Sequence, residues 1–365
     1  MHEKSDPAPD LYDARATDAF LSLAGDLLRQ ASPVTVMEVC GTHTWAISRF
    51  GFAGRLGPVV KFISGPGCPV CVTDEQDLTW AIHAAHAGVV LHVPGDMLRV
   101  PTGNGSLSEA RSRGGDVRVV YSPSDSVKAA KEEPDRQHAY FGVGFETTAP
   151  AIALALERAV DSGLSNFSIY SALKTMPAVL RTILDQPESR IDGFLLPGHV
   201  STITGARAFD FMKAYGVPAV IAGFTPVEIA YAVYTLVSCI LERRPGVLNC
   251  YTRLVSEDGN ELAQQHMAAC FERRDAAWRG FGIVPGSGLA IRTRFAAYDA
   301  ARKHAVIARA VQATEGCMCA SVVMGRISPG ECPLFSRRCT PKTPVGPCMV
   351  SGEGACAAYY AFDRR

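Results

Sequence analysis

The sequence lacks an excess of charge of either sign, and it lacks a long hydrophobic run. Its 365 residues contain 36 Lys and Arg and 36 Asp and Glu, which argues against a polyanionic partner such as nucleic acid. The longest apolar run, residues 229–241, is too short to cross a bilayer, so we interpret it as a buried helix and expect no membrane insertion. The N-terminal residues MHEKSDPAPDLYDAR lack the apolar core of a signal peptide, and we therefore expect a cytoplasmic protein.

A phosphate-binding loop of the form G-x-x-x-x-G-K-[ST] is also missing, so the sequence offers no evidence for nucleotide hydrolysis. Cysteine, in contrast, is abundant, with twelve residues. Because the cytoplasm keeps thiols reduced, we do not expect these to form a structural disulfide framework. Three occur in the first 71 residues and six occur between residues 317 and 356, and such clustering indicates metal or redox chemistry.

Short apolar segments alternate with helical segments over the first two thirds of the chain. This alternation predicts βα units and a parallel sheet. The expected strands fall into two series of four, at residues 34–39, 59–64, 88–93 and 117–122, and then at 139–144, 167–172, 193–197 and 218–223.

The two series resemble each other loosely, which predicts an internal duplication. The expected fold is α/β, with two similar parallel-sheet (Rossmann-like) domains and a C-terminal iron–sulfur domain. An N-terminal helix is expected in residues 1–31 and is predicted to pack on the C-terminal domain. The predicted boundaries are residues 32–130 for the first α/β domain, 131–243 for the second, and 244–365 for a helical, cysteine-rich domain.

Functional residues in open parallel sheets gather beyond the carboxyl ends of the strands. In the first series these positions hold Cys40, His43, Cys68 and Cys71. The second series offers Glu146, Lys174 and His199 instead. If the strand ends of the two domains face each other, these polar side chains line the wall of a cleft opposite the cysteines. Alternatively, His199 only caps the helix that follows it.

Cys40, Cys68 and Cys71 allow three interpretations. They are buried small residues in turns, or they form a structural zinc site as Cys40-x-x-His43 with Cys68-x-x-Cys71, or they are working thiols that bind a soft metal or exchange disulfides. Cys68-x-x-Cys71 precedes a predicted helix whose N-terminus would favour a reactive thiolate.

The C-terminal cysteines lie in a segment rich in Gly and Pro. Their spacing is C-x-C-x12-C-x6-C-x8-C-x7-C, at positions 317, 319, 332, 339, 348 and 356. An iron–sulfur cluster with four cysteine ligands suits such a loop, and zinc is an alternative. Spacing alone does not select four ligands out of six. The isolated Cys239, Cys250 and Cys270 are interpreted as buried bystanders.

Several long motifs in fixed order resemble the HypD family, whose members are maturation factors for [NiFe]-hydrogenases. The motifs are EVCGTHT, SGPGCPVCVTD, GFETTAP, LPGHVS and CPLFSRRCTPKTPVGPCMVSGEGACAAYY. The resemblance extends from about residue 34 to the C-terminus. It implies an assembly scaffold with redox-active thiols rather than a conventional turnover enzyme.

The implied function is to bind iron together with a HypC-type chaperone and to assemble the Fe(CN)2(CO) unit, with a HypE-type partner donating the cyano groups. The hydrogenase large subunit is an indirect partner. The resemblance assigns Cys40 as the ligand of this transient iron, with Cys68 and Cys71 as a working dithiol beside it.

The resemblance also implies a [4Fe–4S] cluster in an arrangement like that of ferredoxin:thioredoxin reductase. Its ligands would be Cys317, Cys332, Cys339 and Cys356. Cys319 and Cys348 would form an adjacent redox disulfide. The alternative function is a free-standing iron–sulfur thiol–disulfide oxidoreductase that binds no additional iron.

Overall fold

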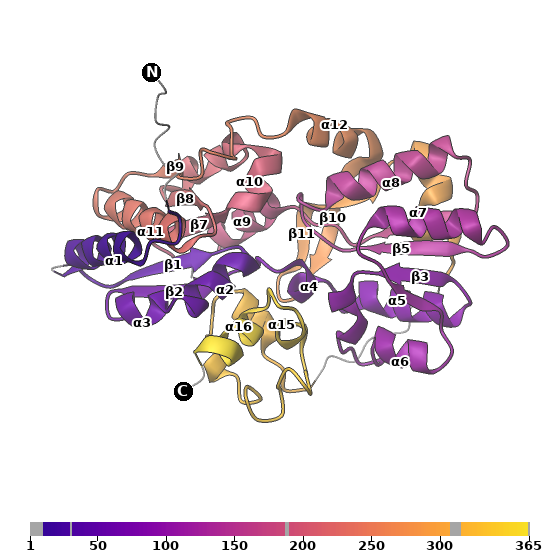
Figure 1. The fold of residues 1–365 in the computed structure, drawn as a ribbon, viewed down its shortest axis with the longest axis horizontal. Coiled ribbons are helices and arrows are strands. Elements are labelled where there is room, and N and C mark those ends of the chain that lie inside the picture. The colour runs from indigo at the N-terminus through magenta and orange to yellow at the C-terminus, as the bar shows by residue number, and fades with distance from the viewer. Residues whose placement is uncertain (1–9, 30, 187–189, 307–314, 364–365) are drawn as a thin grey trace, which may run out of the picture.

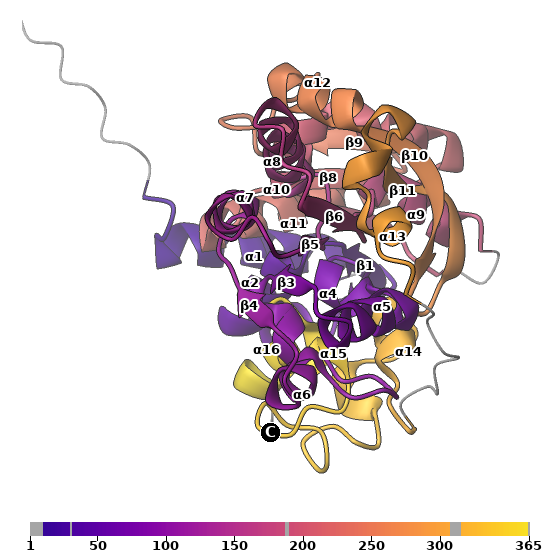
Figure 2. The same ribbon diagram turned by 90° about the vertical axis from the view of Figure 1, so that its right-hand side faces the viewer.

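The computed structural model describes residues 10–29, 31–186, 190–306 and 315–363. Two parallel sheets lie side by side, and the C-terminal segment lies beneath the junction between them (Figure 1). We call the two sheets with their helices the first and second lobes. Residues 315–363 are called the cysteine-rich segment. In Figure 2, which looks along the long axis, this segment lies below the sheets.

The first lobe contains a five-stranded parallel sheet in the order β2-β1-β7-β8-β9. The strands are β1 (Val34–Glu38), β2 (Val60–Ser64), β7 (Gly193–Pro197), β8 (Pro218–Ala222) and β9 (Gly246–Asn249). The helices of this lobe are α1 (Ala14–Leu28), α2 (Gly41–Arg49), α3 (Phe52–Leu56), α10 (Gly198–Thr204) and α11 (Pro226–Leu241). It also contains the 3-10 helix η2 (Ala206–Tyr215).

The second lobe contains a four-stranded parallel sheet in the order β4-β3-β5-β6. The strands are β3 (Val90–Val93), β4 (Val117–Val119), β5 (His138–Gly142) and β6 (Phe167–Ser171). The helices of this lobe are α5 (Glu75–His86), α6 (Leu107–Ser112), α7 (Pro123–Glu132), α8 (Ala149–Asp161) and α13 (Ala300–Lys303), with the 3-10 helices η1 (Gly95–Arg99) and η3 (Thr293–Tyr298).

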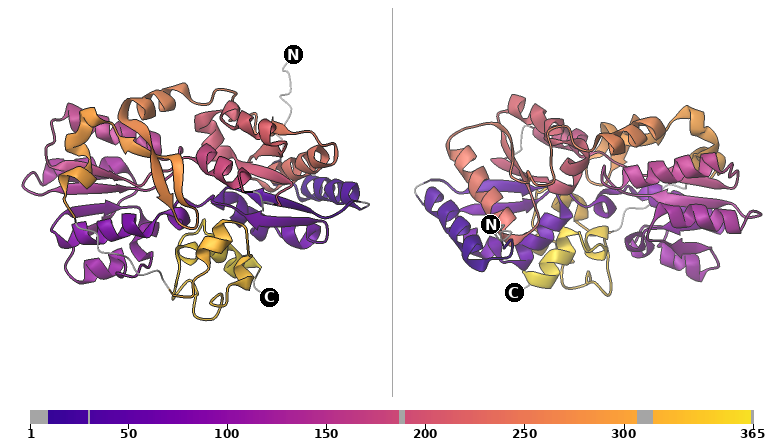
Figure 3. Two further views of the ribbon diagram at one scale, coloured as in Figure 1. Left: turned by 180° about the vertical axis from the view of Figure 1, so that it is seen from behind. Right: turned by 45° about the horizontal axis from the view of Figure 1, so that its top comes forward.

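Several elements connect the lobes, and Figure 3 shows them from behind. They are α4 (Pro69–Val72), α9 (Met176–Leu184), α12 (Glu261–Cys270) and an antiparallel hairpin of β10 (Phe271–Trp278) and β11 (Gly282–Ile291). The cysteine-rich segment has little regular structure, namely α14 (Cys319–Val323), η4 (Pro329–Glu331), α15 (Pro347–Val350) and α16 (Ala355–Phe362).

The α/β class and all eight expected strands are confirmed, with ends shifted by a few residues at most. Capping boxes mark the starts of α7 and α11, at Ser122 with Asp125 and at Thr225 with Glu228. At the start of α5, Asp74 is the cap and accepts a hydrogen bond from the Gln76 N–H.

The expected domain boundary between residues 130 and 131 is wrong. The strands at 88–93 and 117–122 pair with those at 139–144 and 167–172, whereas the first two and last two expected strands share the other sheet. The chain leaves the first lobe after β2 and returns at β7. The alternation of apolar and helical segments predicts which segments are strands. It does not predict which strands pair, because that depends on which lobe each connection leads to.

Two further domain predictions need correction. Helix α1 packs on α11 of the first lobe rather than on the C-terminal domain. The ring of Phe20 lies 5.2 Å from that of Tyr231 and 6.1 Å from that of Tyr234. Residues 244–365 are not one helical, cysteine-rich domain either, since β9 completes the first sheet and β10 and β11 form the hairpin.

No helix in the described ranges is long and apolar enough to span a membrane. The longest apolar run belongs to α11, which is buried along the face that meets α1 and the first sheet.

Two buried histidines lie next to each other in the second sheet. Nε2 of His92 on β3 is 3.0 Å from Nδ1 of His138 on β5. Within the described part of the chain, the remaining nitrogen of each ring is buried without a hydrogen-bond partner. Burial lowers the pKa of His92 from 6.5 to about 4 and also lowers the pKa of His138.

We therefore expect acid to destabilise the fold through His92. This contribution to stability is complete above pH 6.5, where the unfolded chain is also neutral, and it is lost as the pH falls toward 4. Between about pH 7.5 and about pH 5.5, the parent should lose about 1 kcal/mol more unfolding free energy than His92→Gln, measured with denaturant.

The pKa values of the buried carboxyls Glu38 and Glu146 are raised, so protonation of these groups increases the free energy of unfolding as the pH falls over part of this range. They are present in both proteins, so the difference between parent and variant isolates the histidine. Equal losses in the two proteins would contradict the prediction.

Candidate metal and thiol site

Cys40 lies where the first sheet meets helix α2. It follows β1 and occupies the N-cap position of α2, and its side chain is 7% exposed. Burial raises the pKa of the Cys40 thiol to about 12, and the carboxyls of Glu353 and Glu38 raise it further. The backbone N–H groups of His43 and Thr42 act in the opposite direction. Cys40 is thus a protonated thiol that needs a cation to become a thiolate.

Cys68 and Cys71 are joined in a disulfide directly beside Cys40. Cys68 caps helix α4, and its sulfur accepts a hydrogen bond from the Cys71 N–H at 3.2 Å. Gly67 allows the close approach, since a Cβ at that position would lie 2.2 Å from the backbone nitrogen of Cys40. The two motifs are also linked by the Gly41 N–H, which donates to the Gly67 carbonyl at 3.2 Å.

Gly67→Ala should therefore separate the disulfide from Cys40. The added methyl group would overlap backbone atoms, which cannot rotate away, so we expect a loss of about 2–3 kcal/mol of unfolding free energy. Gly54→Ala is the matched control, because a Cβ at Gly54 in α3 has no heavy atom within 4 Å. Denaturant unfolding of the two variants makes the comparison, and a loss of similar size in both would refute the packing argument.

Two carboxyl groups near Cys40 were not anticipated from the sequence. Glu38 is 2% exposed, and its carboxylate accepts hydrogen bonds from the Cys40 N–H at 3.1 Å and from the Thr44 hydroxyl. Burial raises the pKa of Glu38 to about 8. Glu353 of the cysteine-rich segment packs on Gly41, where a Cβ would lie 2.4 Å from the Glu353 carbonyl oxygen, and burial raises the pKa of its side chain.

The signal for Glu38 was an acidic residue within an otherwise apolar strand, VMEV. A charged residue in a buried strand needs a compensating partner. No comparable local signal marks Glu353, because only the folded chain brings residue 353 to residue 41.

The side chain of His43 reaches the end of β8. Its Nε2 lies 2.9 Å from the carbonyl oxygen of Gly223 at the end of β8. Burial lowers the pKa of His43 to about 4, so it is neutral near pH 7. With Cys68 and Cys71 bonded to each other, the predicted zinc alternative lacks its ligands. Among the residues described, no three Cys, His, Asp or Glu side chains are placed to hold one metal ion.

The six C-terminal cysteines surround one small cavity. It is lined by Cys317, Cys319, Cys332, Cys339, Cys348 and Cys356, together with apolar side chains and Gly346. A Cβ at Gly346 would lie 2.4 Å from the Cys317 sulfur, so a side chain there would displace that sulfur. The Val345 N–H donates to the Cys339 sulfur at 3.4 Å. A buried cavity lined by six cysteine side chains, one of which accepts a backbone hydrogen bond, fits a four-iron cluster, whose ligands each bind a different iron.

Within this group, the thiols of Cys319 and Cys348 are hydrogen-bonded to each other. This contact lowers the pKa of Cys319 and raises that of Cys348. Burial raises the pKa of Cys317 to about 12 and also raises that of Cys339. Helix α4, which carries Cys71, packs against both α14 and α15, so the two cysteine groups are adjacent.

The comparisons with known proteins match nearly the whole chain. The family model HypD, described as "Hydrogenase formation hypA family", matches residues 17–363. The chain belongs to the HypD family. Curated relatives named hydrogenase maturation factor HypD include that of Azotobacter vinelandii, 44% identical over 355 residues and 94% of each chain.

The HypD of Rhodobacter capsulatus is 42% identical over 337 residues, which cover 90% of this chain and 89% of that one. The HypD of Escherichia coli strain K12 is 40% identical over 362 residues, 96% of this chain and 97% of that one. As a HypD-family member, the chain acts in hydrogenase maturation.

Glu146 of this HypD-family chain faces a cleft of about 900 Å³ that no cysteine lines. Its buried carboxylate accepts hydrogen bonds from the Met176 N–H at 3.0 and 3.2 Å, and burial raises its pKa to about 7. Arg181 and Arg273 line the same cleft. The structure therefore does not bring Glu146 into the cysteine group.

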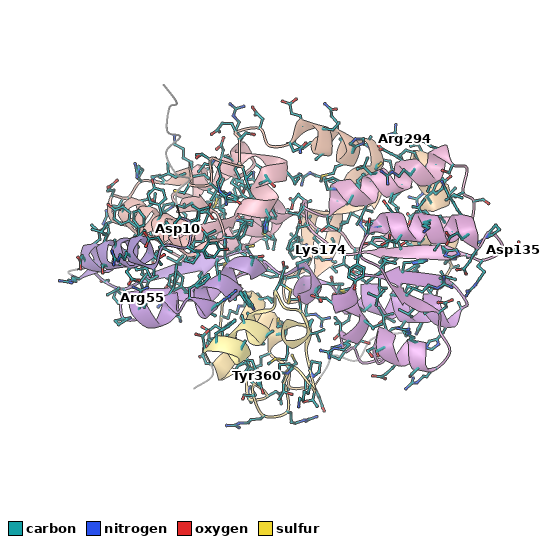
Figure 4. All side chains as sticks on the ribbon, viewed as in Figure 1. Asp10, Arg55, Asp135, Lys174, Arg294 and Tyr360 are labelled. Atoms are coloured by element: carbon teal, nitrogen blue, oxygen red, sulfur yellow. A yellow bond between two sulfur atoms is a disulfide. The ribbon has the colours of Figure 1, made fainter. Side chains whose placement is uncertain are left out.

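His199 and Lys174 also have separate surroundings. The ring of His199 stacks on that of Phe224, with centroids 3.7 Å apart, and the ring of Phe224 also stacks on that of His43, with centroids 4.8 Å apart. His199 is the second residue of α10, and Pro197 occupies the cap position. Lys174 lies near the centre of the molecule (Figure 4), where its Nζ is 3.6 Å from Asp77. Only His199 thus lies close to the CGTH motif.

Proposed function

We propose that this chain, with a HypC-type chaperone, binds iron at Cys40 and assembles the Fe(CN)2(CO) unit there. A HypE-type partner donates the cyano groups. The observation that best supports this proposal is the contact of Gly67 with the backbone of Cys40. This contact holds the Cys68–Cys71 disulfide directly beside a single buried thiol, that of Cys40.

The surroundings of Cys40 favour a bound cation over a free thiolate. The nearby carboxyls of Glu38 and Glu353 raise the pKa of the thiol, and a divalent iron offsets this effect by replacing the proton. A single thiolate is also a soft ligand that leaves coordination positions open for cyanide and CO. The Cys40 sulfur would hold the iron, and Gly41 lets Glu353 close over the same side.

The cysteine-rich segment supports a redox role. Cys317, Cys332, Cys339 and Cys356 would hold a [4Fe–4S] cluster, which supplies single electrons when bound. Cys319 and Cys348 lie against each other and next to this set, and they would store the electrons as a dithiol. The packing of α14 and α15 on α4 supports a further step, in which this dithiol would reduce Cys68–Cys71.

Iron analysis combined with infrared spectroscopy tests the proposal. The chain should be purified anaerobically in complex with its chaperone. We expect about five irons per chain, about four from the cluster, together with nitrile and CO bands. About four irons without these bands would instead favour the alternative, a free-standing iron–sulfur thiol–disulfide oxidoreductase.

A further inference from the structure

The cleft that Glu146 faces lies at the junction of the two lobes. Its walls come from α9, α12 and the β10–β11 hairpin, which connect the lobes (Figure 1), and from α10 and η2 of the first lobe. Its volume of about 900 Å³ falls within the range of small-molecule sites, about 300–1,000 Å³, which occur preferentially at domain interfaces. No cysteine lines this cleft, so neither cysteine group accounts for it.

One end of the cleft carries a cation beside the buried carboxyl of Glu146. Nη1 of Arg273 donates to the carbonyl of Gly286 at 3.3 Å and to the hydroxyl of Thr175 at 3.5 Å. Thr175 precedes Met176, whose N–H donates to Glu146, so the arginine and the carboxyl meet at the start of α9. Glu146 is 3% exposed, and burial raises its pKa to about 7, so it is partly protonated at neutral pH. The guanidinium of Arg273, in contrast, is always charged.

A second guanidinium, that of Arg181 on α9, lines the same cleft. It lies over the ring of Phe211, 3.7 Å from the ring centre. Asp185, one turn further along the chain, accepts a hydrogen bond from the hydroxyl of Tyr215 at 2.8 Å. The guanidinium of Arg181 therefore stacks on an aromatic face and keeps donors for another group.

The third arginine of the cleft, Arg292, lies 3.8 Å from the carboxylate of Glu272, so these two charges offset each other. Neither Arg181 nor Arg273 forms an ion pair with any side chain in the described ranges. The cleft thus holds two unpaired cations and one partly protonated carboxyl. Guanidinium groups present their donors in a planar fork that matches a carboxylate or a phosphate.

Much of the remaining lining is apolar. Phe271 and Leu289 of the hairpin are 3% and 6% exposed, and Ile203, Ala208 and Met267 complete this part of the wall. An apolar group placed here would be removed from water, which favours binding. The cleft therefore combines cationic donors with an apolar wall.

We propose that this cleft binds a small organic anion, a carboxylate or a phosphate ester that carries an apolar body. The charged group lies against Arg273, and the body lies against Phe271 and Leu289. Such a ligand contacts Ala208 of the first lobe and Glu146 of the second, so it bridges the lobes. This inference does not rest on the proposed function, because the cleft shares no residue with the cysteine groups.

Isothermal titration calorimetry of the anaerobic full chain with its cluster tests the inference. The probes are 1-naphthyl phosphate and 1-naphthoate, compared with the uncharged 1-naphthol and with inorganic phosphate. We expect at least one of the two anions to bind at a single site per chain, about tenfold more tightly than either 1-naphthol or phosphate. The tighter of the two identifies the ligand as a phosphate ester or a carboxylate. Absence of binding by both anions, or binding no tighter than that of 1-naphthol, would overturn the inference.

Two variants locate the site. Arg273→Gln should weaken binding of the tighter anion by about tenfold, because it removes a charged donor. Ala208→Phe should weaken it by a similar factor, because the added ring fills the apolar part of the cleft. Arg29→Gln, which removes an exposed charge paired with Asp26 on α1, is the matched control and should bind as the parent does. Parent-like binding by Arg273→Gln or by Ala208→Phe would overturn the inference. If Ala208→Phe fails to fold, Arg181→Gln, at an exposed position, takes its place with the same expected loss.

Discussion

Cys40→Ser should abolish the nitrile and CO infrared bands of the chaperone complex while leaving the fold and the cluster intact. The hydroxyl of serine is a hard, weakly acidic ligand, so it binds low-valent iron far less well than a thiolate. Serine is also nearly the same size as cysteine and is a favourable N-cap residue, so helix α2 should keep its start. The expected outcome is therefore complete loss of the assembled unit with about four irons retained per chain.

Cys250→Ser is the matched control for this variant. Cys250 is partly exposed, follows β9, and lies in the first lobe as Cys40 does, but it belongs to neither cysteine group. The control should retain the bands at the parental intensity. Retention of the bands in Cys40→Ser would show that another residue holds the iron.

Local patterns predicted the strands well because each strand depends mainly on its own sequence. The segments VTVMEV and GFLLP are apolar, short and bounded by turn residues, and both became strands of the first sheet. Their pairing as neighbours, β1 with β7, joins residues more than 150 positions apart. No local signal distinguishes that pairing from one between successive strands, so the predicted duplication divided the chain at the wrong place.

In the candidate site too, the sequence predicted the residues with a local signal and missed those that only tertiary packing brings there. Cys40, Cys68 and Cys71 were recognisable because each follows a strand, and parallel strand ends meet at one edge. Glu353 and Arg279, whose N–H donates to the carbonyl of Val72, reach this region from the C-terminal third of the chain, and their place depends on packing of the cysteine-rich segment and the hairpin. Glu146 also follows a strand, but its strand belongs to the second sheet, and it faces the separate cleft.

Cys332→Ala should remove the brown colour and the broad visible absorption of the anaerobic protein. Alanine supplies no ligand, and a four-iron cluster that loses one of four thiolates is not retained at a buried site without a substitute. The effect should extend beyond colour. The cysteine-rich segment has only short helices, so without the cluster few interactions fix its loops.

The control is Cys348→Ala, which removes a thiol from the same cavity but not from the proposed ligand set. It should keep the colour and lose only the capacity to form a disulfide with Cys319. Amide hydrogen exchange then separates the two variants further. Because α16 packs on α2, Cys332→Ala should expose amides of the cysteine-rich segment and of residues 41–49, which follow Cys40, whereas Cys348→Ala should protect both as the parent does. A fully coloured Cys332→Ala, or a colourless Cys348→Ala, would show that the four ligands have been chosen wrongly among the six.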